Sequence, residues 1–130
     1  MKVLLLENIH PFAERTLIQA GHSVELLKPA LGEQELQKKL AEGVEVLGIR
    51  SKTMVTDAVL SAGKNLKAVG CFCVGTNQVD LKAAQVRGIP VFNAPFSNTR
   101  SVAELVIGEI VFLSRQLGDR VREMHAGRWN

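Results

Sequence analysis

Residues 66–92 have the sequence LKAVGCFCVGTNQVDLKAAQVRGIPVF, and their pattern is the clearest indication of the fold class. Residues 66–72 form a nearly continuous apolar run of the kind found in buried parallel strands. A glycine-containing turn at residues 73–77 leads into a predicted helix that ends at Gly88. A second apolar run follows at residues 89–92, with its proline near the start, where a strand tolerates it. A strand, a helix and a strand in this order indicate one unit of a parallel sheet.

The same alternation of apolar runs and helical stretches fills the N-terminal half of the chain. Predicted strands are residues 2–6, 23–27 and 44–49, and predicted helices are residues 11–20, 33–42 and 56–62. Thr56 and Asp57 are the residue types expected where a helix begins. Five strands joined through helices predict an α/β, flavodoxin-like domain whose five-stranded parallel sheet has helices on both faces. The expected strand order is 2-1-3-4-5, with right-handed crossovers.

A long helix is predicted over residues 101–117, and it is apolar nearly all round its circumference. Such a helix needs cover on more than one side, whereas a five-stranded sheet supplies only one side. We therefore expect a second domain, a partner subunit, or both to pack against this helix.

Composition excludes several classes of protein. The 130 residues are 46% hydrophobic and 22% charged, a globular balance that argues against disorder. No apolar run is long enough to span a membrane, so no membrane partner is expected. The net charge of +3 is small and spread out, and the chain has no tyrosine and one tryptophan. It therefore lacks the basic stripe and the stacking residues of nucleic-acid binders, and its charge fits a local anion site better.

Cysteine and histidine placement gives no sign of a metal site or of catalysis. Cys71 and Cys73 are too close for an unstrained disulfide and have no partners for a metal ion. They alternate along a predicted strand, so both are expected to be buried small apolar side chains. Two free thiols favour a reducing, cytoplasmic location. The three histidines are scattered and are predicted to be surface or loop residues, at His10, His22 and His125.

Polar residues follow three consecutive predicted strands, at the edge where open α/β sheets bind ligands. Arg50 and Ser51 follow the third strand, Gly75 follows the fourth, and Asn98 follows the fifth. An arginine grips a carboxylate or phosphate with two parallel hydrogen bonds, and a glycine lets its backbone N–H approach a ligand closely. We expect a small anionic metabolite there. Each residue also has a simpler interpretation, as a solvated surface charge, a turn residue or a helix cap.

Four runs of sequence carry a resemblance to a known family. They are AVGCFCVGTNQVD at residues 68–80, RGIPVFNAPFSNTRSVAE at 87–104, IRSKT at 49–53 and HAGRWN at 125–130. The chain resembles the D-isomer-specific 2-hydroxyacid dehydrogenases over its whole length. That resemblance implies a flavodoxin-like substrate-binding domain at residues 1–98, followed at 99–130 by the first helix and arm of a Rossmann domain that binds NAD. It further implies a homo-oligomer through helix 101–117 and oxidation of 3-phospho-D-glycerate to 3-phosphohydroxypyruvate, in L-serine biosynthesis.

Site residues are carried over from the family position by position. The resemblance implies that Arg50, Ser51 and Asn98 touch substrate and that the backbone of Val74 and Gly75 faces the substrate carboxylate. It places Val102 near the nicotinamide, and it puts Lys52 at a position often held by arginine.

The family's catalytic arginine, glutamate and histidine, and its glycine-rich NAD turn, fall beyond residue 130. We therefore expect a truncated Rossmann domain, no catalytic residue within the chain, and neither NAD binding nor activity by the chain alone. The alternative is a non-catalytic flavodoxin-like interaction or regulatory module that dimerises through its C-terminal helix.

Overall fold

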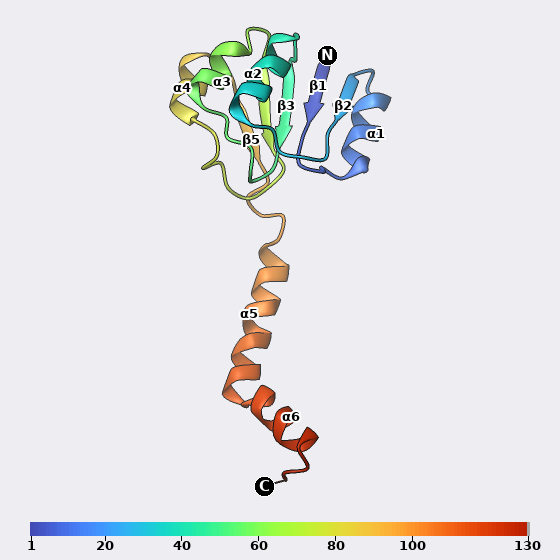
Figure 1. Cartoon of the computed structure of the whole chain (residues 1–130), viewed down its shortest axis with the longest axis vertical. Helices are drawn as coiled ribbons and strands as arrows, with labels where there is room; N and C mark the ends of the chain where they lie inside the picture. Colours follow the sequence, from blue (N-terminus) through green and yellow to red (C-terminus); the bar gives the residue numbers. More distant parts are fainter. Residues whose placement is uncertain (130) are drawn as a thin grey trace. The chain divides into compact units, whose positions relative to one another are not determined.

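A five-stranded, all-parallel sheet forms the centre of the first of the two units into which the chain divides, Met1–Pro95 and Phe96–Asn130 (Figure 1). The computed structural model describes residues 1–129. The strands are β1 (Lys2–Leu5), β2 (Ser23–Leu26), β3 (Val46–Ile49), β4 (Ala68–Cys71) and β5 (Val91–Asn93). Their order in the sheet is β2-β1-β3-β4-β5, and every neighbouring pair is parallel. The predicted flavodoxin-like strand order is therefore confirmed.

Four helices connect these strands, and local signals explain where they begin. They are α1 (Pro11–Gln19), α2 (Glu33–Ala41), α3 (Asp57–Ala62) and α4 (Leu81–Val86). The Thr56 side chain accepts a hydrogen bond from the N–H of Val59, as predicted for the cap of α3. Asp80 caps α4 in the same way, by accepting from the N–H of Ala83.

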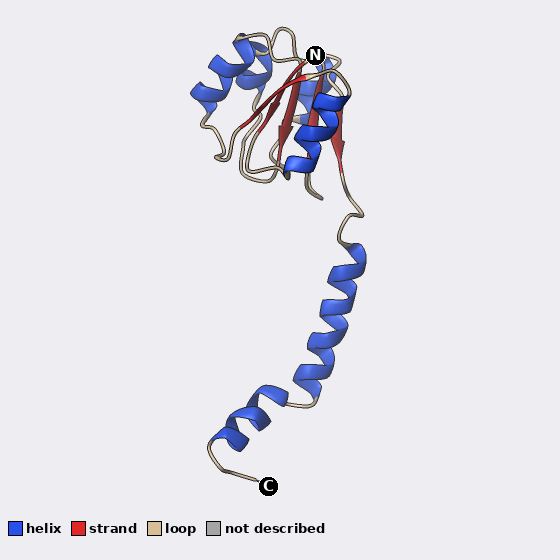
Figure 2. Cartoon of the chain, turned by 90° about the vertical axis from the view of Figure 1, so that its right-hand side faces the viewer, coloured by secondary structure: helices blue, strands red, loops and turns tan. Residues whose placement is uncertain are grey.

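Helices lie on both sides of the sheet (Figure 2), and the sheet separates two apolar clusters, because alternate residues of a strand point to opposite faces. Leu4 and Leu6 join the larger cluster, to which α2, α3 and α4 contribute. Val3 and Leu5 belong to the smaller cluster, against which α1 packs. Helices therefore cover both faces, as predicted.

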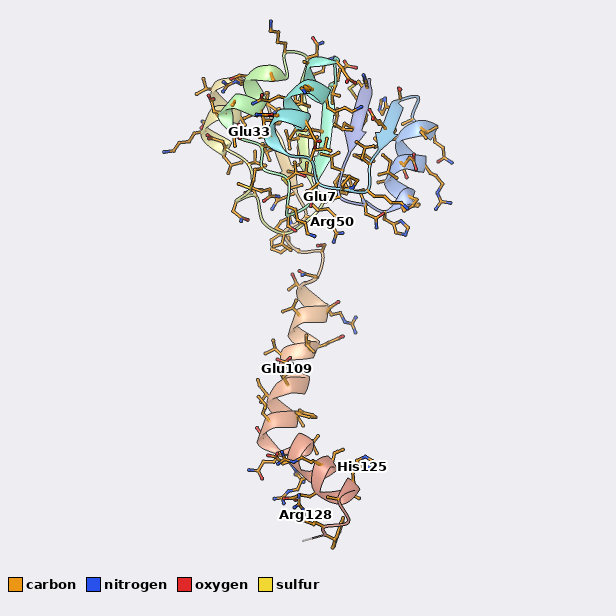
Figure 3. All side chains as sticks on the ribbon, viewed as in Figure 1. Glu7, Glu33, Arg50, Glu109, His125 and Arg128 are labelled. Carbon is orange, nitrogen blue, oxygen red and sulfur yellow. The ribbon has the colours of Figure 1, made fainter. Side chains whose placement is uncertain are left out.

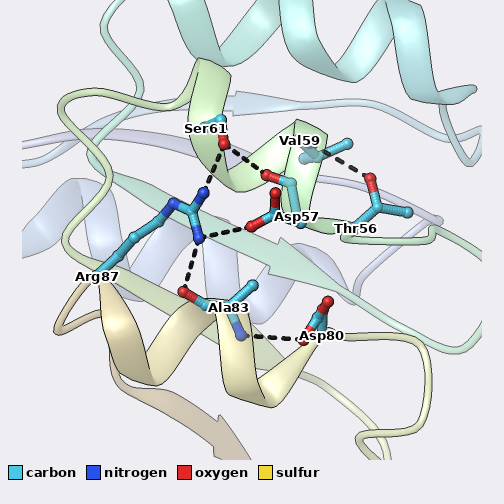
Figure 4. A network of polar contacts seen from close by, with 7 residues as sticks. All are labelled: Thr56, Asp57, Val59, Ser61, Asp80, Ala83 and Arg87. Carbon is cyan, nitrogen blue, oxygen red and sulfur yellow. Dashed lines mark hydrogen bonds and ion pairs between the residues drawn. The ribbon is translucent and has the colours of Figure 1, made fainter.

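A polar network joins α3 to α4 (Figure 4). The guanidinium of Arg87 forms an ion pair of 2.7 Å with Asp57 and donates hydrogen bonds to the Ser61 hydroxyl and the Ala83 carbonyl. Asp57 is well exposed, so the ion pair itself contributes only about 0–1 kcal/mol. The network connects α3 to α4, and none of its residues is among those predicted to bind a ligand.

The second unit contains α5 (Thr99–Ser114) and α6 (Leu117–His125). The single helix predicted over 101–117 is wrong at both ends: α5 begins two residues earlier and ends three residues earlier. Gln116 adopts a left-handed backbone conformation, with φ of 53°, and its N–H donates to the carbonyl of Leu113. This tightened last turn ends α5 and lets α6 begin immediately afterwards.

Every side chain of α5 is exposed in the isolated chain. The exposed apolar residues of α5 are Val102, Leu105, Val106, Ile107, Ile110, Val111, Phe112 and Leu113. The interpretation that this helix needs cover from outside the chain agrees with that exposure. Among the described residues, no helix combines the length and the apolar character required to cross a bilayer.

The division after Pro95 lies close to the predicted domain boundary at residue 98. The assignment of the two parts to a substrate domain and to an NAD domain stays a prediction.

Candidate functional site

Loops from several strands are tied together at the carboxyl edge of the sheet. Because all five strands run parallel, their C-terminal ends meet along this edge. The N–H of Ala94, after β5, donates to the carbonyl of Cys73, after β4. The Asn93 side-chain amide donates to the Val74 carbonyl at 2.7 Å. The loops after β4 and β5 are therefore held to each other by hydrogen bonds.

Glu7 links the end of β1 to the loop after β3 (Figure 3). Its side chain is buried, with the whole residue 7% exposed. One carboxylate oxygen, Oε1, accepts from the backbone N–H groups of Arg50 (3.1 Å) and Thr53 (2.9 Å), and Oε2 accepts from that of Lys52 (2.9 Å). Three backbone donors of the loop are thus satisfied by one side chain more than forty residues away.

Strained backbone accompanies this contact. Glu7 and the next residue, Asn8, both have left-handed conformations, with φ of 62° and 54°. Such values are uncommon for residues other than glycine and cluster where a site requires them. At these two residues the chain turns, and the Glu7 side chain is buried against the loop that carries Arg50.

Competing influences set the pKa of Glu7. Burial is the largest and by itself would raise the pKa, but the hydrogen bonds from Thr53, Lys52 and Arg50 together lower it below the usual value. The buried Thr53 hydroxyl has no hydrogen-bond partner within the described residues, so the backbone N–H groups account for the lowered pKa. Glu7 is therefore ionised at neutral pH.

Gln78 holds the same loop from the other side. This residue is 3% exposed, and its side-chain amide donates to the carbonyl of Arg50 at 2.6 Å. The amide nitrogen also lies 3.3 Å from the Cys73 sulfur and 3.4 Å from the Gly75 carbonyl. Gln78 therefore connects the loop after β3 to the loop after β4.

A basic pocket of about 430 Å³ lies beside the loop that Glu7 and Gln78 hold. Its cationic lining residues are Lys28, Arg50 and Lys52. Glu7, whose carboxylate accepts the three backbone hydrogen bonds described above, is its one acidic lining residue, and Ser51 and Asn8 add polar groups. Within residues 1–129, none of the three cationic side chains has an ion-pair partner. Three unpaired cations around one hollow attract anions, and an anion held by two or three of them gains charge-assisted hydrogen bonds.

Arg50 also borders a second, more apolar hollow. Phe12 and Phe72 line it, together with Ile9 and His10. The Phe72 ring lies over Gly48 and Gly70 of the sheet, where any larger residue would contact it. Arg50 therefore lines both the polar hollow and the apolar one.

The predicted site residues are divided between the two units. Arg50, Ser51, Val74 and Gly75 all lie in the connected loops of the first unit. Asn98 and Val102 are exposed residues of the second unit. The contact of Asn98 with substrate and the place of Val102 near a cofactor stay predictions.

Sequence analysis missed three residues of this edge. Lys28 follows β2 and could have been found by applying the strand-end rule to every strand. Glu7 and Gln78 could not have been found in this way, because no local pattern signals their long-range hydrogen bonds. One prediction is half wrong: Cys71 is buried, but Cys73 is only half-buried, and its sulfur contacts the Arg50 and Gly75 carbonyls.

Comparison with known proteins gives one consistent family. The family model described as "D-isomer specific 2-hydroxyacid dehydrogenase, catalytic domain" matches residues 3–127. Over its whole length the chain is 57% identical to D-3-phosphoglycerate dehydrogenase 1 of Saccharomyces cerevisiae and 50% identical to D-3-phosphoglycerate dehydrogenase of Escherichia coli K12. It spans 28% and 32% of those two proteins.

A solved structure agrees with this result. The NAD-dependent formate dehydrogenase of Staphylococcus aureus, in complex with NAD, superposes on the whole chain with a TM-score of 0.79 at 28% identity. The chain covers 42% of that protein.

Proposed function

The chain belongs to the D-isomer specific 2-hydroxyacid dehydrogenase family, and we propose that it is the substrate-binding part of an NAD-dependent dehydrogenase acting on 3-phospho-D-glycerate. The reaction would oxidise the 2-hydroxyl group to the ketone of 3-phosphohydroxypyruvate, as an entry into L-serine biosynthesis. The observation that carries the proposal is the basic pocket at the carboxyl edge of the sheet. We further propose a cytoplasmic location, because both cysteines are free thiols.

Charge and size in that pocket fit a small phosphorylated acid. The substrate has two anionic ends, and Lys28, Arg50 and Lys52 supply three cations with no partners of their own among residues 1–129. Each hydrogen bond to a charged group contributes roughly 1.5–3 kcal/mol in a shielded site. Two or three such bonds account for useful affinity. Ser51, Asn98 and the backbone of Val74 and Gly75 would complete the recognition of the carboxylate.

NAD is the cofactor of the proposed dehydrogenase, but the residues of this chain do not fit it by themselves. A dinucleotide site needs a glycine-rich turn that leads into a helix N-terminus. The 130 residues hold no GxGxxG run, and Val102 offers only an exposed apolar side chain on α5. We therefore propose that the 130-residue chain alone binds the acid without oxidising it.

Titration calorimetry tests the binding half of this proposal. The chain should bind 3-phosphoglycerate, and added salt should weaken the binding because the contacts are ionic. Arg50→Ala should reduce the affinity about tenfold or more. Absence of binding, or equal binding by Arg50→Ala, would contradict the proposal. With NAD added, pure chain should form no NADH, and steady formation would contradict the inactive state.

Exposure of α5 favours a second candidate, a non-catalytic module that dimerises through this helix. Burying one leucine or isoleucine contributes about 1.5–3 kcal/mol, so the exposed apolar residues of α5 favour self-association. The proposed dehydrogenase would use the same surface as a homo-oligomer. Light scattering at tens of micromolar should show a dimer or larger species, and Ile107→Lys should shift it toward monomer. A monomeric wild-type chain would contradict self-association through α5, both for the non-catalytic module and for the dehydrogenase.

A further inference from the structure

Buried side chains hydrogen-bond to both the N–H and the carbonyl group of Arg50, and the proposed binding function does not explain these contacts. The N–H of Arg50 donates to the carboxylate of Glu7, and its carbonyl accepts from the side-chain amide of Gln78. We propose that Glu7 and Gln78 are positioning residues, which clamp the peptide groups of Arg50 so that its guanidinium faces the anion pocket. This inference rests on the proposed function for the identity of the ligand.

Burial and geometry support the clamp. Glu7 and Gln78 are among three buried polar or charged residues in the described part of the chain, at 7% and 3% exposure. Each reaches Arg50 from a different segment, at sequence separations of 43 and 28 residues. Buried polar groups of this kind are costly to leave unpaired, so both contacts hold the loop in one conformation.

Because Glu7 accepts the backbone hydrogen bonds of the loop at residues 50–53, the side chains of that loop are what remains to bind a ligand. Residues 50–53 direct three N–H groups at one point, an arrangement that would itself attract an anion. The Glu7 carboxylate occupies that point. A ligand anion is therefore held by the exposed side chains of Arg50, Ser51 and Lys52 rather than by the backbone of the loop.

Near-isosteric substitutions test this clamp. Glu7→Gln places a side-chain N–H₂ group where backbone donors need an acceptor, and Gln78→Glu places an oxygen against the Arg50 carbonyl. Glu45→Gln is the matched control, because Glu45 also accepts a backbone hydrogen bond, from Lys2 at 2.8 Å. Lys2 and the residues around Glu45 lie at the opposite end of the sheet from Arg50.

Amide NMR of the ligand-free chain gives the first readout. In Glu7→Gln, the signals of Arg50, Lys52 and Thr53 should shift more than those of other loops, and their hydrogen exchange should accelerate about tenfold or more. Glu45→Gln should disturb Lys2 and leave this loop unchanged. If the loop signals stay in place in Glu7→Gln, the clamp is overturned, whether or not any ligand binds.

Affinity for 3-phosphoglycerate gives the second readout. Glu7→Gln and Gln78→Glu should each weaken binding about tenfold, and each should weaken it clearly less once Arg50 is replaced by alanine, because only Ser51 and Lys52 of the loop then remain to be positioned. An equal loss in the Arg50→Ala background would mean that the two residues act on structure in general and would overturn the proposal. If Glu7→Gln does not fold, Gln78→Glu decides alone. If the wild-type chain binds nothing, the proposed function fails, and the amide signals still decide the clamp.

Discussion

Replacement of Gly48 by alanine is expected to destabilise the first unit, and neighbouring positions supply the controls. Gly48 lies directly opposite Leu5 in the pairing of β1 with β3. A Cβ added at Gly48 would lie 2.5 Å from Cδ2 of Leu5, 3.1 Å from the Phe72 ring and 3.4 Å from Cδ1 of Ile9. Leu5 and Ile9 are 1% and 2% exposed, so neither has free space to retreat into.

The magnitude follows from that crowding. Adding a methyl group to a packed core costs about 1–3 kcal/mol, because side chains leave their preferred rotamers. For a unit of this size, each 1 kcal/mol lowers Tm by about 4–8 °C. Gly70→Ala is the matched control in the adjacent strand: its Cβ would meet the Phe72 ring at 3.5 Å, an ordinary contact, and should change stability by less than about 0.5 kcal/mol.

Urea unfolding followed by far-ultraviolet circular dichroism measures this difference. Trp129 fluorescence is unsuitable, because that residue is 85% exposed and belongs to the second unit. Combining Gly48→Ala with Leu5→Ala should cost about 1 kcal/mol less than the sum of the single changes, since the smaller residue removes the clash. The packing argument fails if Gly48→Ala is as stable as the wild type, or if Gly70→Ala is the more damaging change.

Three further predictions concern the charge and the thiols of the site. Because the pKa of Glu7 is lower in the folded chain than its usual value of 4.5, the stability that it contributes is complete above that value and is lost as the pH falls through the folded-state pKa. The urea concentration at the midpoint of unfolding should therefore fall less from neutral to acid pH in Glu7→Gln than in the wild type. An equal fall in both proteins would contradict this. Burial, followed by the nearby Cys73 and Glu7, raises the pKa of the Cys71 thiol to about 11, so iodoacetamide at about pH 8 should label Cys73 and spare Cys71, as mass spectrometry can check. Lys28→Ala should weaken 3-phosphoglycerate binding about tenfold by calorimetry, whereas Lys38→Ala, on the exposed surface of α2, should not.

Much of the anion site follows from one rule applied to the sequence. Parallel strands end at one edge, so residues that follow strands become neighbours without any contact having to be guessed. This rule predicts Arg50, Ser51 and Gly75 as site residues, whereas Val74 enters only through the family resemblance. Lys28, which follows β2, obeys the same rule.

The second unit shows where local signals fail. An apolar run over residues 101–113 predicts a helix but contains nothing that marks its end. The helix ends at the left-handed backbone of Gln116. Glycine is the usual residue in that conformation, so a glutamine there gives no signal in the sequence. A periodic pattern therefore predicted that α5 exists but not where it stops.

Apolar runs, caps and turns act over a few neighbouring residues, so the order of strands and helices, the parallel sheet and the edge that carries the basic residues could all be predicted from the sequence. The hydrogen bonds that hold the loops of that edge became visible only in the folded chain. Glu7 and Gln78 reach Arg50 across 43 and 28 residues. A side chain that bonds to distant backbone leaves no periodicity or spacing near itself, so its partner is known only once the chain has folded.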